Sequence, residues 1–168
     1  MAAYGAAALA LGYALVSLYW ATGGKRGLGT LGQPFERLAH SEGSATVTVI
    51  WVVVLLKLVG AVLALALVRP WGQRIPSRLL LIAGGLAAAV LTLYGAVEMT
   101  GEALVETGAI RPSGHVDWVA LRWHLGVWDL WFLMWGVALT VALRGVRTGR
   151  IAAHGVLAGQ DLDGEGSS

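Results

Sequence analysis

Four long apolar stretches limit what this chain can fold into more than any other feature of its sequence. An α-helix needs roughly 20 mostly apolar residues to cross the hydrocarbon of a bilayer, where its backbone polar groups must bond within the helix. The stretches that meet this requirement are residues 2–20, 46–68, 79–99 and 119–143. The sequence therefore predicts an all-α polytopic membrane protein, in which residues 1–144 form a compact four-helix transmembrane bundle.

The composition supports this class and excludes several others. Only 13% of the residues are charged and the mean hydropathy is +0.69, whereas about a quarter of the residues in soluble domains are charged. The basic residues are scattered along the chain, so we expect the lipid bilayer, and not nucleic acid, as a partner. Because the chain has no cysteine, disulfides, thiol redox chemistry and cysteine-bound metals are excluded.

The ends of the chain and its orientation follow from where the charges lie. The first stretch has no basic residue before it, and the first in the chain is Lys25, so we predict a retained helix and not a signal peptide. Residues 145–168 are predicted to form a flexible polar tail. Three arginines follow the last stretch, and basic residues favour the cytoplasm. We expect both termini to be cytoplasmic, in a bacterial plasma membrane.

Two charges lie deep inside the apolar stretches, Lys57 in the second and Asp129 in the fourth. Such a charge costs at least about 3 kcal/mol unless a partner compensates it. At 1.5 Å per residue, Lys57 lies roughly 16 Å above the Val68 end of its helix, and Asp129 roughly 21 Å above the Leu143 end. We therefore expect an intramembrane ion pair between Lys57 and Asp129, with Glu98 as the second candidate partner.

Other polar and aromatic side chains gather at one mouth of the predicted bundle. Tyr94 and Glu98 stand one turn apart on the third helix, and His124 and Trp128 lie near the start of the fourth. The sequence predicts that these four residues line a cavity that opens toward the first and third connections, with the charge pair as its floor. A purely structural ion pair with interfacial aromatic anchors explains the same residues. Both interpretations stay open.

Metal and cofactor sites are not expected from the spacing of the candidate ligands. His40, His115 and His124 fall on one predicted membrane side, but no two of them are separated as ligands on one helix would be. No catalytic motif of known spacing is present either. The sequence therefore predicts no metal and no cofactor.

Two short motifs carry a resemblance to a known family. The first is YWATGG, which contains Tyr19, Trp20, Gly23 and Gly24, and the second is LRWHLGVWDLWFLMWGVAL, which contains Trp128 and Asp129. The chain resembles a family of small actinobacterial membrane proteins, domain of unknown function 3995. This resemblance implies a four-helix membrane protein and no established activity.

Three functions remain compatible with the sequence. The first is an integral membrane protein that binds a small or lipidic ligand in a polar intramembrane cavity, or moves it, and transport would then require a homo-oligomer. The second is a membrane enzyme for a lipid or isoprenoid, with Asp129, Glu98 or His124 as acid or base. The third is a structural or accessory subunit. The sequence favours a function other than catalysis.

Overall fold

The computed structural model describes residues 1–32 and 44–165, with the side chains of residues 1–32 and 47–148. Its elements are α1 (Ala2–Ala21), η1 (Leu28–Leu31), α3 (Ser44–Ala66), η2 (Pro70–Arg74), α4 (Ser77–Glu106), α5 (Trp118–Trp123), η3 (His124–Trp128) and α6 (Asp129–Glu165). Within the described residues, four helical stretches are long and apolar enough to cross a membrane: Ala2–Ala21, Val47–Ala66, Ser77–Glu106 and Trp118–Thr148. The predicted all-α four-helix membrane bundle is confirmed.

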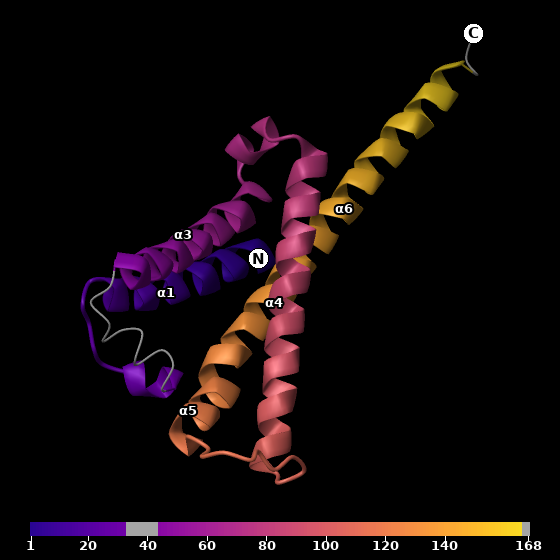
Figure 1. Cartoon of the computed structure of the whole chain (residues 1–168). Coiled ribbons are helices and arrows are strands. Elements are labelled where there is room, and N and C mark those ends of the chain that lie inside the picture. Colours follow the sequence, from indigo (N-terminus) through magenta and orange to yellow (C-terminus); the bar gives the residue numbers. More distant parts are fainter. Residues whose placement is uncertain (33–43, 166–168) are drawn as a thin grey trace.

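The bundle consists of two helical hairpins that cross each other. Helix α1 packs along α3, helix α4 packs along α6, and the two hairpins meet mainly where α1 crosses α6 (Figure 1). Small side chains allow this packing, since alanines of α1 and α3 form much of the buried core together with Trp135 and Leu139 of α6. At the crossing, the Trp131 indole N–H donates to the Leu9 carbonyl at 2.9 Å. The crossing leaves one end of α3 separated from α4.

Helices α4 and α6 approach each other closely at glycines, as expected for membrane helices, whose association depends on small residues. A Cβ atom added at Gly95 would lie 2.7 Å from the Asp129 carbonyl oxygen and equally close to the Leu133 nitrogen. Any larger residue at position 95 would therefore push the two helices apart. This contact fixes the position of Asp129 along the axis of α4.

Two helices extend further than the apolar stretches that predict them. Helix α4 continues past Met99 to Glu106, so Glu102 lies on the helix and not in the connection. Helix α6 runs to Glu165, and Figure 1 shows its last turns projecting beyond the other helices. Backbone hydrogen bonds within a helix need no neighbouring helix. The helical backbone thus covers most of the region predicted to be a polar tail.

The last transmembrane segment contains a π-helical turn between α5 and α6. Asp117 is the N-cap residue of α5, and its side chain accepts a hydrogen bond from the Ala120 backbone N–H at 3.1 Å. The next turn, η3, is π-helical, and the Asp129 N–H donates to the His124 carbonyl five residues earlier. Single π turns inside α-helices are frequent at functional sites. This turn determines how His124 faces Asp129.

Candidate intramembrane site

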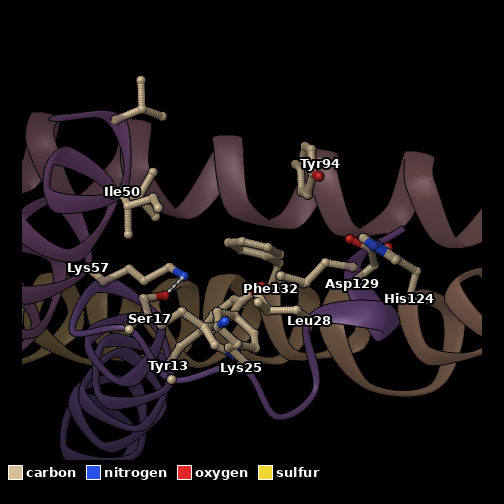
Figure 2. A pocket seen from close by; sticks show the side chains of 16 residues that line it. Tyr13, Ser17, Lys25, Leu28, Ile50, Lys57, Tyr94, His124, Asp129 and Phe132 are labelled. Carbon is tan, nitrogen blue, oxygen red and sulfur yellow. Dashed lines mark hydrogen bonds and ion pairs between the residues drawn. The ribbon is translucent and has the colours of Figure 1, made fainter. Parts of the chain in front are cut away.

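A pocket of about 330 Å³ lies between the two hairpins. Figure 2 shows Lys57 at one end and the side chains of Asp129 and His124 at the opposite end. Tyr13, Tyr94 and Phe132 contribute aromatic walls, and the segment after α1 contributes Gly23, Gly24, Lys25, Leu28 and Leu31. The pocket therefore has apolar walls and one polar group of side chains at each end.

Lys57 occupies the first end, and only 7% of the residue is exposed. Its Nζ atom donates to the Ser17 hydroxyl oxygen at 2.6 Å and lies 3.3 Å from the centre of the Tyr13 ring. A cation over an aromatic face is attracted by the ring quadrupole. Among the described side chains, however, Lys57 has no carboxylate in ion-pair contact. A hydroxyl and a ring therefore solvate the ammonium group, and no anion among the described side chains balances its charge.

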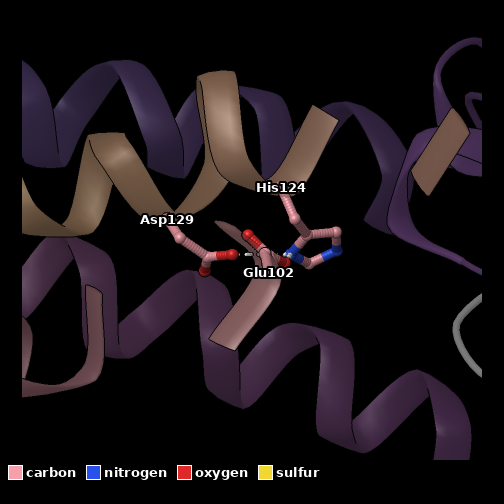
Figure 3. A group of neighbouring side chains, drawn as sticks. All are labelled: Glu102, His124 and Asp129. Carbon is pink, nitrogen blue, oxygen red and sulfur yellow. Dashed lines mark hydrogen bonds and ion pairs between the residues drawn. The ribbon is translucent and has the colours of Figure 1, made fainter. Parts of the chain in front are cut away.

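A group of three ionisable side chains occupies the other end, shown in Figure 3. Asp129 is 1% exposed, and its Oδ2 atom lies 2.9 Å from Nδ1 of His124. Glu102 comes from α4, and its Oε1 atom lies 3.8 Å from the same imidazole nitrogen. We call these three residues the carboxylate–imidazole cluster. A buried pair of His124 and Asp129 thus lies inside the bundle.

The ion pair expected between Lys57 and Asp129 is absent, because each side chain has another partner. Ser17 is the hydrogen-bond partner of Lys57, and His124 is that of Asp129. Both residues line the same pocket, so their placement toward the interior agrees with the expectation. Lys57 and Asp129 would lie at matching depths only if their helices were parallel, whereas the hairpins cross (Figure 1). Because of this crossing, α3 lies away from α6 at the depth of these two residues.

The four residues expected to line a cavity are only partly brought together. Tyr94 and His124 line the pocket, but Glu98 is exposed on α4. At 100° per residue, Glu102 lies within roughly 20° of Gly95 around α4, whereas Glu98 is rotated by roughly 60° from it. Because Gly95 faces α6, Glu102 is the α4 carboxylate that reaches His124.

Trp128, the fourth of these residues, is buried beside the pocket and does not line it. Its ring stacks on Tyr13 with centroids 5.7 Å apart and meets Trp20 edge-on at 5.5 Å. The Trp128 indole N–H donates to the Thr30 hydroxyl at 3.2 Å. These contacts attach η1 to the start of the last transmembrane segment. Trp128 therefore supports the pocket wall from behind.

The YWATGG motif shapes the turn that follows α1. Gly24 donates its N–H to the Tyr19 carbonyl at 2.9 Å, and a Cβ atom on Gly24 would collide with the Tyr19 ring. The Trp20 indole N–H donates to the Arg26 carbonyl at 3.0 Å. Gly23 adopts a φ of +95°, which side chains with a Cβ disfavour. The motif thereby folds residues 23–25 back over the pocket.

Tyr13, Ser17 and Glu102 are the site residues that the sequence analysis missed. Tyr13 and Ser17 lie one turn apart on α1 and hold the Lys57 ammonium group. A serine and a tyrosine within an apolar helix are a weak signal, since neither carries a charge. Glu102 has a clearer signal, because it follows Tyr94 and Glu98 at four-residue intervals, but its partner became visible only through the close packing of α4 on α6.

Comparison with known proteins identifies a family and no activity. The family model described as "Protein of unknown function (DUF3995)" matches residues 10–139, which include the second half of α1, all of α3 and α4, and both ends of the pocket. No curated protein and no solved structure matches the chain. The function is therefore inferred from the chemistry of the pocket.

Proposed function

This chain belongs to the DUF3995 family, and we propose that it binds a small or lipidic ligand with an anionic group in its intramembrane pocket. Lys57 carries this proposal. A buried ammonium group without an anion is costly in a low-dielectric interior. A carboxylate or phosphate of a ligand would supply the missing charge. Four helices suit such binding, whereas transport would require a homo-oligomer.

The shape and the lining of the pocket support a ligand with an apolar part. Its volume of about 330 Å³ is at the lower end of ligand pockets, which range from about 300 to 1,000 Å³. Val49, Ile50 and Val53 of α3 line it beside Lys57, and the exposed Lys25 adds a second cation. The anionic group would lie at Lys57, while the apolar part lies along the α3 side chains.

Binding of a matched pair of amphiphiles tests the proposal. Decanoate and decanol share an alkyl chain and differ in charge, so their affinities for the purified full-length protein isolate the contribution of the carboxylate. We expect decanoate to bind more tightly and Lys57→Met to weaken its binding by about 10-fold to 100-fold. This range corresponds to the roughly 1.5 to 3 kcal/mol of a hydrogen bond to a charged group.

The control variant is Arg74→Gln, which removes a cation at η2, away from the pocket. Arg74→Gln should leave the affinity for decanoate unchanged. Native mass spectrometry of the purified protein gives an independent measurement, because a co-purified anionic lipid should be retained by the wild type and lost from Lys57→Met. Equal affinities for decanoate and decanol in the wild type would contradict the proposal.

A membrane enzyme is the second candidate, and the contact between His124 and Asp129 favours it. A buried carboxylate that orients an imidazole is a common arrangement for general acid–base catalysis, and both residues line the pocket. Incubation of the protein with a bacterial lipid extract, followed by mass spectrometry, tests this activity. A product that His124→Asn abolishes and the exposed variant Glu106→Gln retains would support an enzyme. An unchanged lipid profile would contradict it.

A further inference from the structure

Buried oxygen atoms without partners distinguish the carboxylate–imidazole cluster from an ordinary structural hydrogen-bond network. Oδ1 of Asp129 and Oε2 of Glu102 are buried and have no hydrogen-bond partner within the described part of the chain. Buried polar atoms are nearly always satisfied, because an unsatisfied one costs about 1 to 3 kcal/mol, and more when it is charged. Within the described residues, these two oxygen atoms therefore lack a cationic or hydrogen-bonding partner.

None of the described side chains supplies that partner. In the described residues, the arginine nearest in sequence to His124, Arg122, pairs at 3.1 Å with Glu106 at the exposed edge of α4. The ion pairs of Asp129 and Glu102 are made with His124 alone. Two carboxyl groups therefore share one imidazole, and among the described side chains no other cation contacts them.

The distances within the cluster fit a common metal ion. One ligand atom from each of the three residues can be chosen so that all lie within 4.8 Å of one another, and the imidazole Nδ1 lies 2.9 Å from Asp129 and 3.8 Å from Glu102. Nitrogen and oxygen ligands lie about 2.0 to 2.2 Å from Zn²⁺ in tetrahedral sites, which places neighbouring ligands roughly 3.3 to 3.6 Å apart. The observed distances lie on either side of that range.

The surroundings of His124 match those of a metal-bound histidine. Its Nδ1 atom faces the two carboxylates, and the ring also forms a hydrogen bond with the backbone of Leu31. Metal-binding imidazoles almost always use their second nitrogen to donate to a carbonyl or carboxylate, which fixes the ring. The π-helical turn η3 brings the two ligands of one helix together, and such turns are frequent at functional sites.

We propose that Glu102, His124 and Asp129 bind one divalent transition-metal ion. One imidazole and two carboxylates suit Zn²⁺, Fe²⁺ or Mn²⁺, and they disfavour Ca²⁺ and Mg²⁺, which prefer oxygen ligands alone. Three protein ligands leave a coordination position open, as in catalytic metal sites. Since Asp129 and His124 also line the pocket, the bound ion would border the same space as Lys57. The proposal stands apart from anion binding at Lys57.

Zinc binding by the full-length protein tests the proposal. The protein is purified without a polyhistidine tag, treated with a chelator, dialysed against Zn²⁺ and analysed for bound metal. We expect one zinc ion per chain at the cluster, displaced by Mn²⁺ or Fe²⁺ far more readily than by Ca²⁺. Zinc should also raise the melting temperature. Asp129→Asn should lower the affinity at this site by on the order of 100-fold or more, since loss of even a supporting residue costs 10-fold to 100-fold.

Two further variants keep the test decisive if Asp129→Asn fails to fold. Glu102→Gln replaces a ligand from the neighbouring helix with an amide of the same shape, and it should lose the same zinc ion and the same thermal shift. Glu98→Gln is the matched control, because Glu98 lies one turn earlier on α4 and is exposed. It should bind zinc as the wild type does. Equal zinc binding by the wild type and Glu102→Gln, or no binding by the wild type, would overturn the proposal.

Discussion

The two ends of the pocket hold their intramembrane charged groups by different contacts. At one end, Lys57 is a single cation held by the Ser17 hydroxyl and the Tyr13 ring. At the other end, two carboxylates surround one imidazole, and two of their oxygens have no partner in the described residues. Among the described side chains, no anion contacts the first end, and no cation other than His124 contacts the second. Charges of opposite sign that line one pocket therefore need not pair with each other.

The largest expected effect is at the second end. Asp129→Ala should lower the free energy of unfolding by about 3 to 5 kcal/mol, because the buried partner of His124 is lost while the imidazole stays in the interior. Unfolding in detergent micelles, followed by circular dichroism, measures this change. Glu98→Gln serves as the control and should change the free energy by less than about 0.5 kcal/mol. A comparably small effect of Asp129→Ala would mean that the cluster is solvated and not buried.

A smaller effect is expected at the first end. Ser17→Ala removes the hydroxyl that accepts from the Lys57 ammonium group, and a hydrogen bond to a charged group contributes about 1.5 to 3 kcal/mol. The same unfolding measurement should therefore show a loss in this range. In the background of Lys57→Met the loss should nearly disappear, because the charge is gone. If Ser17→Ala costs the same in both backgrounds, Ser17 does not act through Lys57.

The smallest expected quantity is the coupling between the two ends. A double-mutant cycle with Lys57→Met and Asp129→Asn should give an interaction free energy below about 0.5 kcal/mol, because these side chains do not contact each other. The cycle of His124→Gln with Asp129→Asn should give about 0.5 to 3 kcal/mol, as expected for residues in contact. A larger value for the first cycle than for the second would restore the direct ion pair between Lys57 and Asp129.

Several features of the site followed from local sequence alone. Lys57 and Asp129 share helix faces with small residues, so their direction toward the bundle interior was predictable without knowledge of the neighbours. Tyr94 and His124 were likewise expected to line a cavity, and both do. A charge in an apolar stretch has few alternatives to the interior, because lipid does not solvate it. The expectation of no metal site, by contrast, assumed the ligand spacing of ideal α-helices. The π-helical turn η3 departs from that geometry.

Hydropathy and periodicity within single segments are enough to predict the membrane class, the four helices and the presence of interior charges. Tertiary structure decided which charges meet. In an ideal α-helix, residues five apart lie roughly 140° from each other, but the π turn at η3 brings His124 onto Asp129. The contact at Gly95 brings Glu102 to the same point, and the crossing of the hairpins leaves Lys57 with Ser17. Partners are fixed by helix geometry and crossing, which depend on all the helices together.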